Sequence, residues 1–154
     1  MQSAKPFHPN HKSAVMYLSR LYKDARYFQI LFQSIFLVYG ILYLHWVNES
    51  WLYSTYFITS LITQFACELV FGKKDIPVWQ RYKKGIPSVL ISSFGLSLLL
   101  KTNLVWVAIM AAAVSIVSKY IIRIKGKHIF NPSALGIVVA VFFTGNAWIS
   151  PGQW

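Results

Sequence analysis

A short segment between two apolar runs carries the residue types best suited to bind an anion. It contains Lys127 and His128, followed by Asn131, Pro132 and Ser133. Asn is a favoured N-cap and Pro is favoured at the first helical position, so the spacing predicts a helix that begins at Pro132. The first N–H groups of that helix, from Ser133 on, would be free to attract negative charge. Lys127, His128, Asn131 and Ser133 are therefore candidate contacts for a phosphate, a carboxylate or a planar anionic cofactor. An ordinary helix start that meets lipid phosphates accounts for the same residues equally well.

Glu68 is the second residue with chemical potential, because it is the only acid within an apolar run. Acids inside a membrane are costly and often functional, which makes Glu68 a candidate for ion or proton handling. The alternative is an interfacial carboxylate that is neutralised by Lys73 or Lys74, a few residues further along the chain.

Catalytic and metal-binding patterns are missing from the sequence. There is no Ser-His-Asp set, no pair of carboxylates and no phosphate-binding loop. A single cysteine, Cys67, excludes an internal disulfide and a Cys-pair metal site. We therefore assign no catalytic residue and no metal ligand, and expect at most a non-catalytic or cofactor-holding subunit of an enzyme.

The composition sets the class of protein that must position these residues. Of 154 residues, 56% are hydrophobic and 12% are charged, whereas soluble domains are about 25% charged. The apolar residues fall in runs that predict an all-α polytopic membrane protein with five transmembrane helices. A basic arm with an interfacial helix (1–26) precedes the membrane domain (27–149), and a tail (150–154) follows it. The expected spans are 27–47, 51–71, about 87–100, about 104–122 and 132 to about 148.

The basic residues set the orientation. The net charge is +11, and Lys and Arg gather in the arm, after the second span and between the fourth and fifth spans. Lys101 alone lies on the opposite side. The positive-inside rule then predicts an N-in, C-out topology. This rule explains the excess of positive charge, so we do not expect a nucleic-acid partner.

The third span is unusual because it is short and rich in small residues. About 14 to 16 residues reach only ~24 Å, less than the ~30 Å hydrocarbon core. Ser92, Ser93 and Gly95 lie within it, and such a segment is typical of a short or broken helix beside a binding site. Alternatively, these residues form a face that packs directly against the small residues of the fourth span, such as Ala111 and Ser115.

The segment from Lys125 to Gly136, with Phe130-Asn131-Pro132 at its centre, resembles a known family of membrane proteins. The stretches 92–102 and 148–154 share the resemblance, which covers nearly the whole chain from about Asp24. The family contains the membrane components termed B in the sodium-translocating NADH:quinone oxidoreductase and D in the Rnf electron-transport complex. The chain is most similar to a divergent Rnf D-like branch, and only to the N-terminal half of the family.

The resemblance implies one half of a pseudo-symmetric two-repeat bundle, akin in fold to urea and ammonium channels, in a bacterial inner (cytoplasmic) membrane. Family members bind flavin and carry electrons, in some cases coupled to sodium or proton movement. Flavin-binding candidates here are Lys127, His128, Asn131 and Ser133, beside Ser92, Ser93 and Gly95. The family's covalent FMN attaches to a threonine of a Ser-Gly-Ala-Thr type motif in the second half, which has no counterpart here. FMN or riboflavin would therefore be held non-covalently.

The resemblance also implies partners, namely other membrane subunits and lipid. Either a second half continues beyond Trp154, or the chain is a half-length relative that pairs with another chain. Two other functions stay open. One is a structural scaffold subunit without redox activity, and the other is a small-solute channel, which rests on fold analogy alone.

Overall fold

The computed structural model describes residues 24–46, 50–72, 75–124 and 127–149, and only the backbone of Ile124, Lys127 and His128. This part of the chain folds into α2 (Ala25–Leu42), α3 (Ser50–Phe71), α4 (Val78–Leu99), α5 (Val105–Ile121) and α6 (Pro132–Thr144). Four short strands join them: β1 (Leu100–Thr102), β2 (Arg123–Ile124), β3 (Lys127–His128) and β4 (Ala147–Ile149). The predicted all-α class is confirmed. The predicted arm up to residue 23 and the tail 150–154 lie outside the described residues.

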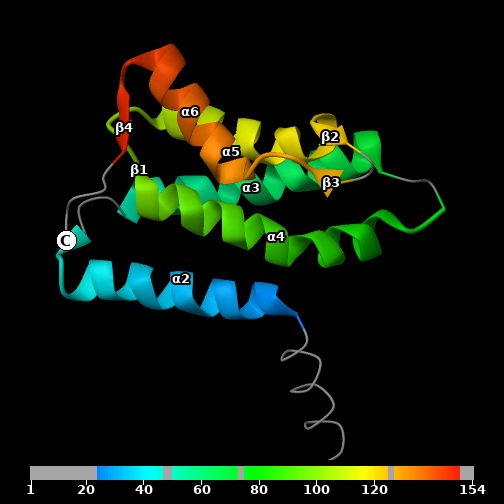
Figure 1. Ribbon diagram of the computed structural model, residues 1–154, viewed down its shortest axis with the longest axis horizontal. Coiled ribbons are helices and arrows are strands. Elements are labelled where there is room, and N and C mark those ends of the chain that lie inside the picture. Colours follow the sequence, from blue (N-terminus) through cyan, green and yellow to red (C-terminus); the bar gives the residue numbers. More distant parts are fainter. Residues whose placement is uncertain (1–23, 47–49, 73–74, 125–126, 150–154) are drawn as a thin grey trace, which may run out of the picture.

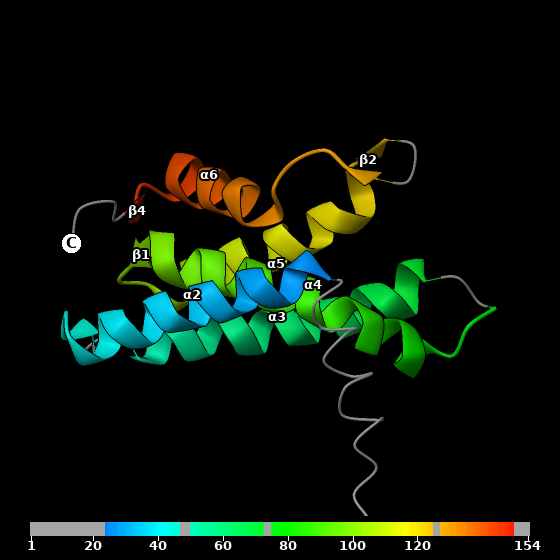
Figure 2. The same cartoon turned by 60° about the horizontal axis from the view of Figure 1, so that its bottom comes forward.

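The helices pack in a layered bundle. Figure 1 shows α2 lying along α4, on the side of α4 that faces away from α5 and α6. Helix α3 packs against both α4 and α5, and α6 covers α5 while also touching α4. Figure 2 shows α6 above α5, with α2 in front of α3 and α4. Helix α2 is therefore the outer member of the bundle, and α4 connects it to the rest.

The apolar core lies at the end of the bundle where β1 pairs with β4. The two strands are antiparallel, with Thr102 opposite Ala147, and the Thr102 hydroxyl donates to the Asn146 carbonyl at 2.8 Å. Buried apolar side chains from α3, α4, α5 and α6 meet here with one residue from each of the two strands. They are Leu52, Tyr56, Leu96, Leu100, Val107, Ala108, Ala111, Ala112, Ile137, Ala140 and Ala147. The other end of the bundle, where α5 leads into β2, holds the polar cluster of Glu68 described below.

Small residues of α4 and α5 bring α6 close to both helices. A Cβ atom added to Gly136 would lie 2.5 Å from the Ala111 carbonyl oxygen and 2.0 Å from the Ser115 hydroxyl oxygen. A Cβ added to Gly95 would lie 2.8 Å from the Ser133 hydroxyl oxygen. One of the two explanations that the sequence offered for these residues was direct packing of the small faces of α4 and α5 on each other. At these positions both faces contact α6 instead.

The predicted short or broken third span is wrong. Helix α4 is continuous over 22 residues, through Pro87, and begins at Val78 after a Pro77 N-cap. The basic stretch before Pro87 is helical because Lys and Arg are good helix formers that need no apolar surroundings. Within it, Trp79 stacks on Tyr82 with ring centroids 5.9 Å apart. The serines remain in an apolar helix because their hydroxyls donate to carbonyls of the preceding turn, as Ser93 does to Val89 at 3.1 Å.

The fifth helix is the short one. Helix α6 has 13 residues and ends at Thr144, whereas the sequence predicted a span to about 148. Gly145 has a left-handed φ of 62°, which stops the helix, and residues 147–149 then form β4. By length and composition, α2 is the one described helix that is long and apolar enough to cross a membrane. Helices α5 and α6 are apolar but shorter.

Candidate functional site

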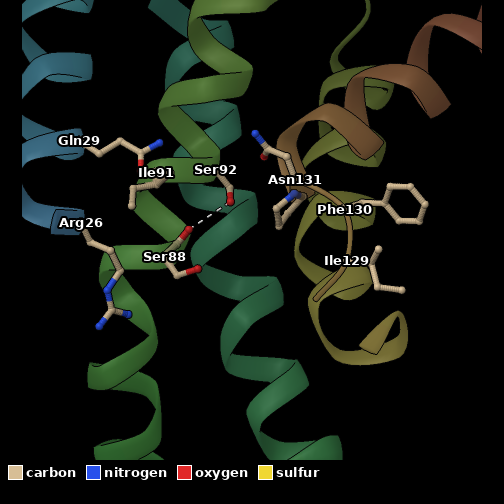
Figure 3. Close-up of a pocket in the computed structure, with 9 residues that line it drawn as sticks. Arg26, Gln29, Ser88, Ile91, Ser92, Ile129, Phe130 and Asn131 are labelled. Carbon is tan, nitrogen blue, oxygen red and sulfur yellow. Dashed lines mark hydrogen bonds between the residues drawn. The ribbon is translucent and has the colours of Figure 1, made fainter. Parts of the chain in front are cut away.

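A cavity of about 370 Å³ opens between α2, α4 and the start of α6. Figure 3 shows Arg26 and Gln29 of α2 on one side, Ser88 and Ser92 of α4 on the next, and Asn131 across from Ser92. The full lining is Arg26, Gln29, Ser88, Ile91, Ser92, Ile129, Phe130, Asn131 and Pro132. The volume falls within the range of small-molecule sites, and polar donors converge on it from three elements.

The start of α6 forms as the sequence predicted. Asn131 is the N-cap and Pro132 opens the helix. The Asn131 Oδ1 atom accepts from the Ser133 backbone N–H at 3.2 Å and from the Ser133 hydroxyl at 2.8 Å. The N–H of Ser133, expected to be free for an anion, is therefore already used. What Asn131 has left to offer a ligand is its side-chain amide nitrogen, and its side chain is exposed.

The α4 wall of the cavity is supported by a buried cation. Lys119 of α5 is 5% exposed, and its Nζ donates to the Ser88 carbonyl at 2.8 Å and to the Ser88 hydroxyl at 3.2 Å. Ser92 also donates to the Ser88 carbonyl, at 3.1 Å. Among the described residues, no ion pair joins Lys119 to a carboxylate. A positive charge therefore stands directly behind the Ser88 wall.

The α2 wall carries a cation that is already paired. Arg26 donates to both carboxylate oxygens of Asp24, through Nε at 2.9 Å and Nη2 at 2.8 Å. Asp24 also caps α2 by accepting from the Arg26 backbone N–H at 3.1 Å. The side-chain and backbone hydrogen bonds from Arg26 hold the pKa of Asp24 below its usual value. Asp24 therefore stays ionised and offsets most of the charge that Arg26 brings to the cavity.

The predicted site residues are only partly brought together. Ser92 and Asn131 line the cavity, and Gly95 and Ser133 contact each other at the α4–α6 crossing beside it. Ser93 is buried in the bundle and is not part of the lining. The side chains of Lys127 and His128 lie outside the described residues.

No protein-family model, no curated protein and no solved structure matches the chain. The family resemblance thus stays a prediction that rests on the residues quoted for it.

Sequence reasoning missed four participants: Arg26, Gln29, Ser88 and Lys119. For one of them, the sequence contained a signal that could have identified it. Lys119 is a cation within an apolar run, and such a residue is by default a candidate for a functional role. In the sequence analysis, Lys119 was used only as one of the positive charges that set the membrane orientation. The residues Arg26 and Gln29 gave no signal, because only the packing of α2 on α4 brings them to this cavity.

Glu68 lies in a separate polar cluster near the end of α3. Its Oε1 accepts from the Tyr120 hydroxyl at 2.7 Å and from the Gln64 amide at 3.2 Å. Its Oε2 lies 3.5 Å from Arg81 Nε, and both side chains are largely buried, at 13% and 12% exposure for Arg81 and Glu68. The expected partners Lys73 and Lys74 lie outside the described residues. With an arginine, a tyrosine and an amide around it, this carboxylate holds α3, α4 and α5 together.

Lys101 is a buried cation at the opposite end of the bundle. It is 2% exposed, and its Nζ lies 5.0 Å from the Trp46 ring centroid and 5.1 Å from that of Tyr53. It also donates to the Tyr53 hydroxyl at 3.2 Å. Aromatic faces stabilise a cation when water is excluded. This arrangement ties β1 to the start of α3.

Proposed function

We propose that the chain is a multi-pass membrane subunit of an Rnf-like or Nqr-like electron-transport assembly, and that the cavity between α2, α4 and α6 holds a flavin non-covalently. The observation that carries this proposal is the convergence of Ser92 and Asn131, both predicted, with Arg26 and Gln29 on one cavity. This proposal has three parts, namely membrane placement, flavin binding and a role in electron transport.

Exposed apolar side chains support the membrane placement. The outer face of α2 presents Phe32 at 59% exposure and Ile35 at 54%, and α6 presents Phe142 at 80% and Phe143 at 75%. Soluble monomers rarely expose continuous apolar faces of this kind. In a bilayer, the same faces would contact acyl chains or neighbouring subunits, and α3 to α6 would span with α2.

The distribution of charge supports the proposed orientation. Arg26, Arg81, Lys84 and Arg123 all lie at the end of the bundle where α2 and α4 begin and where α3 and α5 end. The end with β1 and β4 carries Lys101, which is buried. By the positive-inside rule, the first end would face the cytoplasm of a bacterial cell. The cavity that we propose for flavin lies toward this end.

The donors around the cavity fit the edge of a flavin. The free amide nitrogen of Asn131 and the side chain of Gln29 can donate to ring carbonyls, and the apolar Ile91 can lie against a ring face. The buried charge of Lys119 behind Ser88 favours negative charge in the cavity. When bound, the flavin would supply one-electron and two-electron transfer. The residues of this chain would bind it, orient it and favour its anionic states.

The paired state of Arg26 and Asn131 favours a second function, a scaffold subunit without redox activity. Arg26 is held by Asp24, and the carbonyl of the Asn131 side chain is held by Ser133. If these internal contacts are the whole role of both residues, the cavity needs no ligand. The two functions differ in whether flavin accompanies the chain.

Substitutions at Asn131 separate capping from flavin binding. Asn131→Asp keeps the acceptor that caps α6 but removes the amide donor and adds negative charge, whereas Asn131→Ala removes both. We expect both variants to lose flavin from membranes purified with the full chain, and only Asn131→Ala to lose about 1 kcal/mol of stability. Visible absorbance and acid-extracted FMN or riboflavin measure the first effect, and thermal melting measures the second. A wild-type complex that is intact and active in electron transfer but contains no flavin on this chain would refute flavin binding and support the scaffold function.

A further inference from the structure

A second cavity, also of about 370 Å³, lies at the cationic end of the bundle and shares no lining residue with the first. It is enclosed by the end of α3, the first half of α4, the end of α5 and β2. Its lining is Glu68, Phe71, Gly72, Arg81, Lys84, Gly85, Tyr120 and Arg123. Three of these residues are cationic and one is acidic, so the cavity is a basic site whose free charge depends on how these four pair.

The single carboxylate of the lining is already occupied. Glu68 faces Arg81 at 3.5 Å, and Arg81 Nη2 also donates to the Glu68 backbone carbonyl at 3.1 Å. The other two cations, Lys84 and Arg123, have no ion pair among the described residues. After the Glu68–Arg81 pair is set aside, the cavity keeps a net charge of about +2 from these two side chains.

Arg123 is held in position for an anion. Its Nε donates to the Lys119 carbonyl, and its guanidinium carbon lies 5.1 Å from the ring centroid of Tyr120. These two contacts fix the plane of the guanidinium group and leave its two terminal amino groups as donors. Such a fork matches two oxygens of a phosphate.

One wall of the cavity is apolar and open to the surroundings. Phe71 stacks on Tyr120 with centroids 6.0 Å apart, and Phe71 is 55% exposed. Ile121 follows Tyr120 and is 64% exposed. A phosphate next to Arg123 and Lys84 would therefore have exposed hydrocarbon immediately beside it. This combination suits a phosphate that carries acyl chains better than a free ion.

We propose that this cavity binds the phosphate of an anionic phospholipid, with Arg123 and Lys84 on the headgroup and Phe71 beside an acyl chain. Basic pockets between helices at the cytoplasmic side of a membrane suit such headgroups. The proposal rests on the membrane placement proposed above and is independent of flavin. The shared chemistry is phosphate recognition, so the test must separate lipid from soluble phosphate.

The experiment measures lipid retention by native mass spectrometry on the full chain in detergent. The probes are phosphatidylglycerol, phosphatidylcholine and inorganic phosphate. Arg123→Gln is the primary variant, because Lys84 also lines a neighbouring opening with Asp24 and Arg26. Lys83→Gln is the matched control, because Lys83 is exposed, lies over the Trp79 ring at 5.1 Å and does not line the cavity. Arg123→Lys keeps the charge, and melting curves verify that each variant is folded.

We expect wild type to prefer phosphatidylglycerol over phosphatidylcholine. Arg123→Gln and Lys84→Gln should each weaken phosphatidylglycerol binding by about fivefold, and Lys83→Gln by less than about twofold. Arg123→Lys should restore much of the loss. An equal effect of Lys83→Gln would mean a diffuse surface potential and would overturn the site. Inorganic phosphate that binds as tightly as the lipid would overturn the lipid assignment, as would a wild type without lipid preference. Extraction of the chain from membranes by alkaline carbonate would instead refute the membrane placement itself, whatever the flavin content.

Discussion

Replacing Gly136 with Ala tests whether α6 is held against α5 as closely as the structure requires. The added Cβ would lie 2.5 Å from the Ala111 carbonyl oxygen and 2.0 Å from the Ser115 hydroxyl oxygen. The hydroxyl can rotate away, but the carbonyl belongs to the backbone of α5. Because ordinary contacts begin at 3.4 Å, α6 must move by about 0.9 Å, the difference between that distance and 2.5 Å.

The size of the effect follows from two opposing terms. Forcing an extra methyl group into a packed contact costs about 1–3 kcal/mol. Alanine recovers about 1 kcal/mol because it is a better helix former than glycine. The backbone clash cannot be relieved by a rotamer change, so we take the upper end of the first term and expect a net loss of about 2 kcal/mol. That corresponds to a fall in Tm of roughly 4–8 °C.

Thermal melting of the purified chain in detergent measures this loss, and Ser115→Ala supplies the control. The Ser115 hydroxyl is buried and has no hydrogen-bond partner among the described residues, so its removal alone should be neutral or slightly stabilising. The double variant should recover only part of the Gly136→Ala loss, because the Ala111 carbonyl remains in place. A Gly136→Ala variant that melts at or above the wild-type temperature would show that α5 and α6 are not in contact here.

Substitutions at three further positions probe other parts of the structure by the same melting assay. Gly145→Ala should cost about 1 kcal/mol from its left-handed φ of 62° alone, since no atom lies within 4 Å of the added Cβ. Gly145→Asn should cost less, because Asn tolerates this conformation better. If both variants melted at the wild-type temperature, the left-handed backbone at Gly145 would be contradicted. Glu68→Ala should destabilise by about 1–3 kcal/mol more than Glu68→Gln, because the amide keeps an acceptor within the cluster while both lose the charge that faces Arg81; equal losses would mean that the hydrogen bonds there contribute little. Lys119→Met should leave stability unchanged or raise it while lowering flavin retention, because it removes a buried charge from behind Ser88; a lower Tm with flavin retained would refute that role.

Local signals predicted the helix starts and stops that depend on one or two residues. The cap at Asn131 and the opening Pro132 form as expected. The apolar runs also predicted closely the bounds of two helices, as 51–71 against Ser50–Phe71 and about 104–122 against Val105–Ile121. In each case the signal that defines the helix lies inside the helix.

The predicted bounds of the third and fifth spans were wrong, because each helix was assumed to extend as far as its run of apolar residues. Helix α4 extends into a basic stretch that no hydropathy pattern would include. Helix α6 stops at Gly145 although Ala147-Trp148-Ile149 is apolar, because those residues pair with β1 instead. Gly145 is itself a readable stop signal. What residues 147–149 form after Gly145 depends on pairing with a strand that is far away in the sequence, and such pairing has no local signal.

Both cavities depend on contacts between distant segments, which is why the sequence yielded only parts of them. Asn131 and Ser92 were found because each belongs to an unusual local pattern. Arg123 and Lys84 were counted as topology charges, and nothing local distinguishes them from Lys83. The structure separates them by one fact, namely which side chains share a cavity with the paired Glu68.

Lys119 is a position where the stability of the fold and the proposed function make opposite demands on the same side chain. Burying a cation beside a serine hydroxyl and a carbonyl, with no ion pair to a carboxylate among the described residues, costs free energy that two hydrogen bonds only partly offset. A methionine would fill the same volume without that cost. The same charge, behind Ser88, raises the electrostatic potential of the cavity that Ser88 lines, and water screens it little there. The backbone carbonyl of Lys119 also accepts from Arg123, which lines the second cavity. If the two cavities hold anions, as we propose, those anions would account for a buried cation that is expensive for the fold and lies next to both.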